Sequence, residues 1–138
     1  MHRDVLVDTS AWYALLNRRD AFHEAAVRIF RALRDESARL LTHNYVIAET
    51  TALVHHRLGH KAARRWLVDL LPVAEVLWVD REIHNAAVAS FLTAPAGLSL
   101  VDMVSFEIMR RNGIRRAFAF DEDFGRQGFE VLSAPENE

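Results

Sequence analysis

The chain has 138 residues, the length of one domain, and 51% hydrophobic with 26% charged residues is the balance of a soluble globule. This composition excludes a disordered or collagen-like chain, and the absence of cysteine excludes thiol catalysis, disulfide bonds and cysteine-ligated zinc. The net charge of −2 gives no bulk attraction for a polyanion, although 16 of the 17 basic residues are Arg. No apolar run approaches the roughly 20 residues of a membrane helix, and the first residues carry acids that do not suit a signal peptide. We therefore expect a cytoplasmic protein.

The first half of the chain alternates short apolar runs with segments whose apolar residues recur at helical spacing. These patterns predict strands at 5–7 and 39–42, and helices at 9–16, 21–34, 44–58 and 61–71, the last ended by Pro72. Thr9 or Ser10 is expected to cap the first of these helices, and Thr42 or Asn44 the third. Gly59 is placed to end the third helix.

The second half of the chain continues the same alternation. It predicts strands at 73–79, 117–120 and 129–132, and helices at 80–92 and 99–112. Residues 133–138 form a polar tail that we expect to be frayed. Short apolar strands separated by helices indicate a parallel sheet covered on both faces. We therefore predict a single domain over 1–138 with a three-layer α/β/α, Rossmann-like fold and a short, mostly parallel sheet.

Four acidic residues are candidates for a functional site, two because they follow strands and two because they lie on partly apolar helices. Asp8 and Asp121 each follow an apolar strand, which puts both at the carboxyl edge of the sheet, where such folds bind ligands. Glu49 lies at the shoulder of an apolar helical stripe, where a charge needs a partner. Asp102 has capping-box spacing from Ser99, so its role is either structural or that of a functional anion at a helix start.

Taken together, these acids predict a cation site. Several ionised carboxylates within a few ångströms repel one another unless some are protonated or a cation binds. Mg²⁺ and Mn²⁺ prefer oxygen ligands, and Mg²⁺ leaves positions open for water and phosphate oxygens.

In the order and spacing of these acids the sequence resembles the PIN-domain nucleases, among which the compact VapC-type toxins are the closest in size. The resemblance runs from residue 4 to 132 and rests on the segments 7–11, 98–102 and 120–124, with Glu49 between them and Gly128 after them. It maps the four acids of the family onto Asp8, Glu49, Asp102 and Asp121, with Asp123 as an accessory acid and Thr9 or Ser10 as the small hydroxyl residue. One departure is Ala119, where the family often has Thr.

The resemblance implies metal-assisted hydrolysis of RNA, with Mg²⁺ or Mn²⁺ as the cofactor. Asp8 and Asp121 would be direct ligands, Asp102 a direct or water-mediated ligand, and Glu49 would hold a metal-bound water or help to orient the nucleophile. A hydroxyl from Thr9 or Ser10 would support a carboxylate or the phosphate. The resemblance further implies a toxin paired with an antitoxin protein, and a homodimer.

Pairs of arginines are the candidates for holding an RNA backbone, because the acids themselves repel phosphate. We expect this role first at Arg18, Arg19, Arg64 and Arg65. The pairs Arg110–Arg111 and Arg115–Arg116 are further candidates, although the former suits the end of a helix before Gly113 equally well.

Other functions remain open at this stage. The acids at 121–123 also fit the metal-binding motif of Toprim-type nucleases and primases, which expect Glu where this chain has Asp8. A non-catalytic, receiver-like regulatory domain would use an acidic pocket but needs a late Lys, and Lys61 is wrongly placed. A dehalogenase-type phosphatase expects Asp at the position of Ser10. A dinucleotide-binding domain is excluded by the lack of a glycine-rich first turn.

Overall fold

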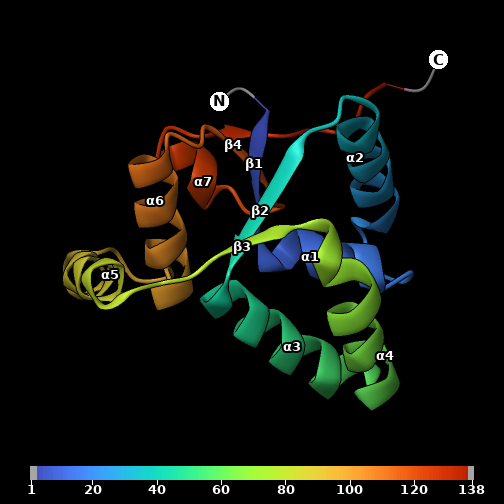
Figure 1. Cartoon of the computed structure of the whole chain (residues 1–138), viewed down its shortest axis with the longest axis horizontal. Coiled ribbons are helices and arrows are strands. Elements are labelled where there is room, and N and C mark those ends of the chain that lie inside the picture. The colour runs from blue at the N-terminus through green and yellow to red at the C-terminus, as the bar shows by residue number, and fades with distance from the viewer. Residues whose placement is uncertain (1–2, 137–138) are drawn as a thin grey trace.

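A parallel sheet runs through the middle of the molecule and carries its helices on both faces (Figure 1). The computed structural model describes residues 3–136, in which five strands lie in the order β3-β2-β1-β4-β5, every neighbouring pair parallel. The strands are β1 (Asp4–Val7), β2 (Arg39–His43), β3 (Glu75–Leu77), β4 (Arg116–Phe118) and β5 (Glu130–Val131). The central strand β1 is buried along its whole length, as an apolar strand covered on both faces must be.

The order of the strands places a topological switch point between β1 and β4, and such points open a crevice at the carboxyl ends of the strands. Val7 is in register with Phe118, and the N–H of Asp8 donates to the carbonyl of Phe118 at 3.0 Å. The residues that follow the two strands therefore share one edge of the sheet. The same order differs from the 2-1-3-4-5 order of receiver domains, which argues against the regulatory alternative.

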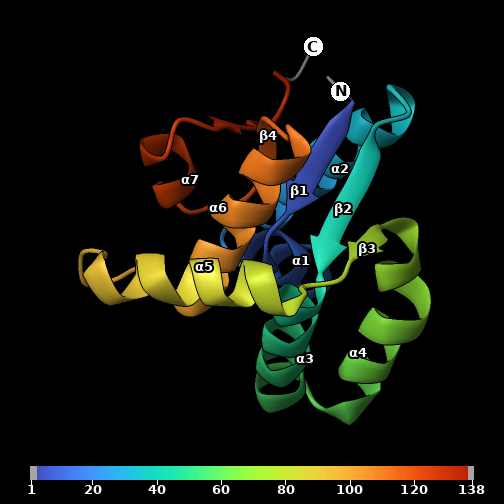
Figure 2. The same cartoon turned by 60° about the vertical axis from the view of Figure 1, so that its left-hand side comes forward.

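Helices lie on both sides of the sheet (Figures 1 and 2), and alternate residues of the central strands pack against opposite layers. Val5, Val7 and Phe118 belong to an apolar cluster with α1 and α2, whereas Leu6 and Ala117 belong to a second cluster with α6. The predicted three-layer α/β/α fold is therefore confirmed. The regular α-helices are α1 (Thr9–Leu16), α2 (His23–Asp35), α3 (Asn44–Leu58), α4 (His60–Arg65), α5 (Arg81–Thr93), α6 (Leu100–Asn112) and α7 (Asp123–Arg126).

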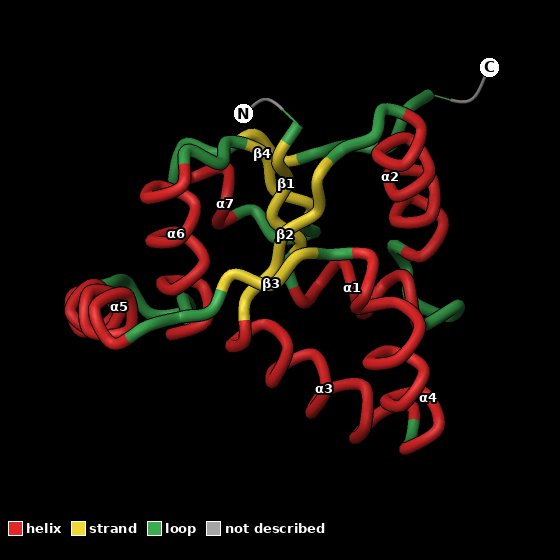
Figure 3. Tube along the Cα trace, viewed as in Figure 1, coloured by secondary structure: helices red, strands yellow, loops and turns green. Residues whose placement is uncertain are grey.

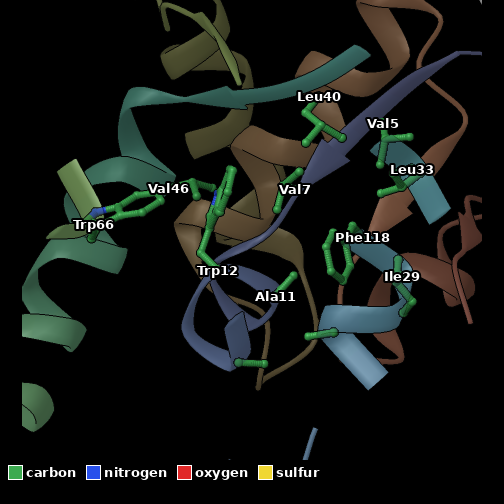
Figure 4. Close-up of a cluster of buried hydrophobic side chains, with 12 residues drawn as sticks. Val5, Val7, Ala11, Trp12, Ile29, Leu33, Leu40, Val46, Trp66 and Phe118 are labelled. Atoms are coloured by element: carbon green, nitrogen blue, oxygen red, sulfur yellow. The ribbon is translucent and has the colours of Figure 1, made fainter. Parts of the chain in front are cut away.

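Helices α3 and α4 form an arm that extends beyond the sheet, with α4 returning alongside α3 (Figure 3). Gly59 joins them with a φ of 93°, a conformation that favours glycine and explains the predicted helix end. The arm is anchored by Trp66, which is fully buried against Trp12 with ring centroids 4.9 Å apart (Figure 4). Replacing a buried Trp by Ala costs about 3–5 kcal/mol, so this contact fixes the arm to the core.

The N-terminal caps of two helices differ from those predicted. Asp8, rather than Thr9 or Ser10, caps α1, because its carboxylate accepts a hydrogen bond from the N–H of Ser10. His43, rather than Thr42 or Asn44, caps α3, because its Nδ1 accepts a hydrogen bond from the N–H of Val46. Asp8 directly follows β1 and His43 is the last residue of β2, so each cap lies where a strand passes directly into a helix.

Other element boundaries also differ from the prediction. The helix predicted at 61–71 is a succession of α4, a π-helix (Trp66–Leu70) and a 3₁₀-helix (Leu71–Val73) whose first turn accommodates Pro72. The four-residue α7 was not predicted, because it is too short to show periodicity. Residues 133–136 form no helix or strand, although Ala134 packs against the first apolar cluster, and the rest of the predicted frayed tail lies outside the described residues.

Candidate metal centre

Asp8 lies at the switch point directly after β1 and is only 5% exposed. Its Oδ2 accepts hydrogen bonds from the N–H of Ser10 at 3.2 Å and from the Ser10 hydroxyl at 2.8 Å. The same hydroxyl oxygen accepts from the N–H of Phe120 at 3.0 Å. Ser10 therefore connects the acid that follows β1 to Phe120, which lies between the end of the neighbouring strand β4 and Asp121.

Asp121 lies in the turn between β4 and α7. Its Oδ1 accepts a hydrogen bond of 2.7 Å from the N–H of Asp123, so its own chain orients the carboxylate. Asp123 in turn accepts from Arg126 Nη1 at 3.1 Å. Ala119 is buried in the apolar cluster under α6, and no hydroxyl is present there to orient Asp121. The amide of Asp123 orients Asp121 instead.

Asp102 lies in the first turn of α6 and forms a complete capping box with Ser99. The Ser99 hydroxyl accepts from the N–H of Asp102 at 3.1 Å, and Asp102 Oδ2 accepts from the N–H of Ser99 at 2.9 Å. The structural interpretation of this spacing is thus correct. It does not conflict with ligation, because a carboxylate offers lone pairs on two oxygens and one capping bond occupies only part of them.

Asp102, Asp121 and Asp123 form what we call the acidic cluster: each places a carboxylate oxygen within 4.8 Å of the others. Asp8 lies outside this group of three but close to it. The pKa of Asp8 is raised to about 6, chiefly by burial and to a smaller extent by repulsion from Asp102 and Asp121, while the two hydrogen bonds from Ser10 act in the opposite direction. Burial also raises the pKa of Asp121, and the charges of Asp123 and Asp102 act in the same direction.

These features fit a hard divalent cation. The donors are all carboxylate oxygens, the set that Mg²⁺ and Mn²⁺ prefer over softer metals. The raised pKa values of Asp8 and Asp121 show that the folded chain holds negative charge against its own repulsion and desolvation. A cation would remove that penalty, and Asp102, Asp121 and Asp123 are the residues placed to hold it, with Asp8 beside them.

Glu49 is half-buried on α3 and is not part of the acidic cluster. It lines a pocket of about 560 Å³ together with Tyr45 and with Val101, the residue before Asp102. Next to it, the hydroxyl of Thr50 donates to that of Thr9 at 3.1 Å and joins α3 to α1. Glu49 on α3 and Val101 on α6 thus line one pocket.

A buried histidine connects the helices that carry Glu49 and Asp102, a feature that the sequence analysis missed. His43 and Ser105 are both fully buried, and His43 Nε2 lies 2.8 Å from Ser105 Oγ. Because Nδ1 accepts from the backbone at the start of α3, Nε2 carries the proton and donates to Ser105. Burial lowers the pKa of His43 to about 3, so this histidine is neutral. Its position after an apolar strand was the only available signal.

The candidate arginines fall into two groups. Arg18, Arg19, Arg64 and Arg65 are exposed, on the loop after α1 and on α4. The other two pairs lie towards the amino edge of the sheet, where α6 ends and β4 begins. There Arg111 pairs with Glu82 and Glu107, Arg116 with Glu36, and Arg110 bonds Gln127. A pocket of about 870 Å³ lies at that edge and contains none of the four acids predicted from the sequence.

The chain belongs to the PIN-domain family, whose model matches residues 5–130. The predicted family is therefore confirmed, and with it the enzyme class, a ribonuclease that hydrolyses phosphodiester bonds. Within residues 3–136, no helix is long and apolar enough to cross a membrane.

Within this family the chain is similar to the VapC toxins. It is 36% identical over 127 residues to the 23S rRNA-specific endonuclease VapC20 of Mycobacterium tuberculosis, covering 91% of this chain and 95% of that protein. The crystal structure of VapC20, described as a sarcin-ricin loop cleaving toxin, superposes with a TM-score of 0.85 at 34% identity, over 94% of this chain and 98% of that one. FitAcB from Neisseria gonorrhoeae shares the fold at 17% identity, with a TM-score of 0.67 over 93% and 96% of the two chains.

Proposed function

We propose that this protein is a Mg²⁺- or Mn²⁺-dependent endoribonuclease that acts as the toxin of a toxin–antitoxin pair. The observation that carries the metal dependence is the acidic cluster at the switch point of the sheet. Such a cluster repels an RNA backbone on its own, and bound divalent cations reverse the sign of the local charge. When bound, the cation would polarise the phosphate and favour ionisation of the attacking water.

The chain's own residues would divide the remaining tasks. Asp121 and Asp123 are the proposed direct ligands, with Asp102 from the start of α6 and Asp8 from the end of β1. Glu49 shares a pocket with Val101, the residue before Asp102, and is proposed to orient the attacking water through its carboxylate.

Ser10 is the proposed supporting hydroxyl, because its hydrogen bonds hold Asp8 in place. Thr9, by contrast, uses its hydroxyl in a bond with Thr50 and is proposed to set the distance between α1 and α3. The exposed arginines after α1 and on α4 are proposed to hold the RNA backbone.

The similarity to VapC20 supports 23S ribosomal RNA as the substrate. An antitoxin protein that covers the site, a homodimer, a single domain over the whole chain and a cytoplasmic location belong to the same proposal. The alternative of a Toprim-type nuclease has no support from the family match.

The proposal is tested by cleavage of 23S ribosomal RNA with purified protein. Cleavage should require Mn²⁺ or Mg²⁺, stop with EDTA and be abolished by Asp121→Asn. Glu122→Gln is the matched control, because Glu122 is adjacent and acidic but outside the acidic cluster. Cleavage that continues in EDTA, or that survives Asp121→Asn at full rate, would contradict the metal-dependent mechanism.

A further inference from the structure

A further pocket lies beside the acidic cluster and shares Asp121 with it. It is a pocket of about 530 Å³ between the start of α2, the end of β4 and the β5 edge of the sheet. Its apolar lining is formed chiefly by Phe22, Ile29, Phe120, Val131, Leu132 and Ala134. Asp121 and Glu122 are its only charged residues within the described chain, and neither Lys nor Arg lines it. The pocket therefore suits a flat apolar group and offers no cation for a phosphate.

Two phenylalanines form a stacked pair in this pocket. The rings of Phe22 and Phe120 are 9° from parallel, with centroids 4.8 Å apart. Phe22 nevertheless keeps 49% of its surface exposed, whereas the nearby Phe118 is fully buried. Because Phe120 covers one face of the Phe22 ring, we infer that the exposed half of this residue includes part of the other face. A ring held in this way can accept a third flat group in the stack without prior ordering.

We propose that Phe22 is the stacking platform for an unpaired base of the RNA substrate, in the nucleotide next to the scissile phosphate. This inference rests on the proposed function. Phe120 directly precedes Asp121, so a base stacked on the pair lies next to a carboxylate of the acidic cluster. With no cation in the pocket, the phosphate of that nucleotide is directed towards the cluster and its metal. Glu122 is paired with Arg126 at 2.9 Å, which limits repulsion at this point.

The geometry favours a base over an apolar peptide side chain. The exposed feature is a half-exposed aromatic ring in a pocket that contains Asp121, and unpaired RNA bases bind proteins chiefly by stacking on such rings. The shared residue Asp121 makes the pocket continuous with the acidic cluster rather than a separate surface. An antitoxin side chain in the same pocket is the competing outcome of the test.

The experiment compares Phe22→Ala, Phe22→Trp and Phe91→Ala in Mn²⁺-dependent cleavage of a synthetic oligoribonucleotide. The oligoribonucleotide spans a site that the wild-type enzyme cuts in 23S ribosomal RNA. Phe91→Ala is the matched control, because Phe91 is similarly exposed, at 42%, but lies on α5 outside the pocket. Phe22 makes its hydrogen bonds through its backbone, so its substitution keeps those bonds at the start of α2.

We expect Phe22→Ala to lower kcat/KM about 10- to 100-fold, the range for losing one base–aromatic stack. Phe22→Trp should stay close to wild type, and Phe91→Ala should have no effect. An abasic nucleotide at the contacted position should make the wild-type enzyme and Phe22→Ala equally slow.

Equal effects of Phe22→Ala on intact and abasic RNA, or no effect on either, would overturn the stacking inference while leaving the ribonuclease proposal standing. A Phe22→Ala effect confined to inhibition by the antitoxin would overturn it in favour of a peptide occupant. Failure of the wild-type enzyme to cut RNA with Mn²⁺ would overturn the proposed function itself.

Discussion

The hydroxyl of Ser10 donates a 2.8 Å hydrogen bond to Asp8 Oδ2. Its oxygen also accepts from the N–H of Phe120 at 3.0 Å, so one side chain spans the switch point between β1 and β4. The bond to Asp8 favours the charged form of that carboxylate and opposes the effect of burial on its pKa. Ser10 thus holds a buried acid charged and in place beside the acidic cluster.

Removing this hydroxyl should weaken the metal site. We predict that Ser10→Ala raises the pKa of Asp8 further and lowers both Mn²⁺ affinity and the cleavage rate about 10- to 100-fold, as for other residues that orient ligands. Calorimetric titration with Mn²⁺ and single-turnover cleavage would measure the two effects. Ser10→Thr keeps the hydroxyl and should restore most of both. Wild-type Mn²⁺ affinity in Ser10→Ala would show that the bond is incidental.

The raised pKa of Asp8 makes a prediction about stability and pH in the metal-free protein. Below the ordinary carboxyl pKa of 3.8, Asp8 is protonated in both the folded and the unfolded chain and costs nothing. As the pH rises towards about 6, the unfolded chain loses this proton first, so the folded state loses stability; above that pH the loss is complete.

Asp8→Asn should therefore stabilise the metal-free fold by about 1–3 kcal/mol near neutral pH and by almost nothing near pH 3.5. Urea unfolding in EDTA at the two pH values measures the difference. The same variant should lose the rise in melting temperature that Mn²⁺ gives the wild type by binding the native state. A variant less stable than wild type at neutral pH would contradict the sign of this argument.

The turn after β4 offers a matched pair of acids. Asp123 and Glu122 both form ion pairs with Arg126, at 3.1 and 2.9 Å, but only Asp123 belongs to the acidic cluster. Asp123→Asn should weaken Mn²⁺ binding about tenfold or more, in the range for lost metal-site groups, whereas Glu122→Gln should leave it unchanged. Mn²⁺ titration followed by electron paramagnetic resonance distinguishes them. Equal losses in the two variants would assign the effect to Arg126 instead.

The edge at which the acids lie could be predicted from the sequence. Asp8 and Asp121 follow apolar runs, and parallel strands end on one side of a sheet, so their shared edge follows from the sequence pattern. The capping box of Ser99 and Asp102 was also visible, because it depends on a spacing of three residues. These features are local or follow from the direction of the strands.

Contacts between distant segments could not be predicted. Nothing in the sequence says that β4 lies beside β1, which is what allows Ser10 to bond both Asp8 and the backbone of Phe120. His43 and Ser105 are 62 residues apart, and neither carries a signal of its partner. The place of Glu49 relative to the acidic cluster depends on how α3 and α6 pack, and helical periodicity leaves that open.

The His43–Ser105 bond joins the start of α3 to α6 one turn beyond Asp102, so it should set the position of Glu49 relative to that acid. Ser105→Ala leaves the His43 cap of α3 intact but removes this link and leaves a buried N–H unpaired, at a cost of about 1–3 kcal/mol. We predict that kcat falls about tenfold while the KM for RNA is unchanged, because a displaced orienting group affects the transition state more than binding.

The matched control for this prediction is Thr51→Val, which is on α3. It removes a hydroxyl that accepts a 3.0 Å hydrogen bond from Trp66 Nε1, donates to the carbonyl of Ile47 and makes no bond to α6. It should lower the free energy of unfolding to a similar extent and leave kcat unaltered. Steady-state kinetics and urea unfolding of both variants measure the two quantities. If Ser105→Ala and Thr51→Val lose stability equally and both retain kcat, the buried histidine has a structural role only, and the position of Glu49 is set by helix packing alone.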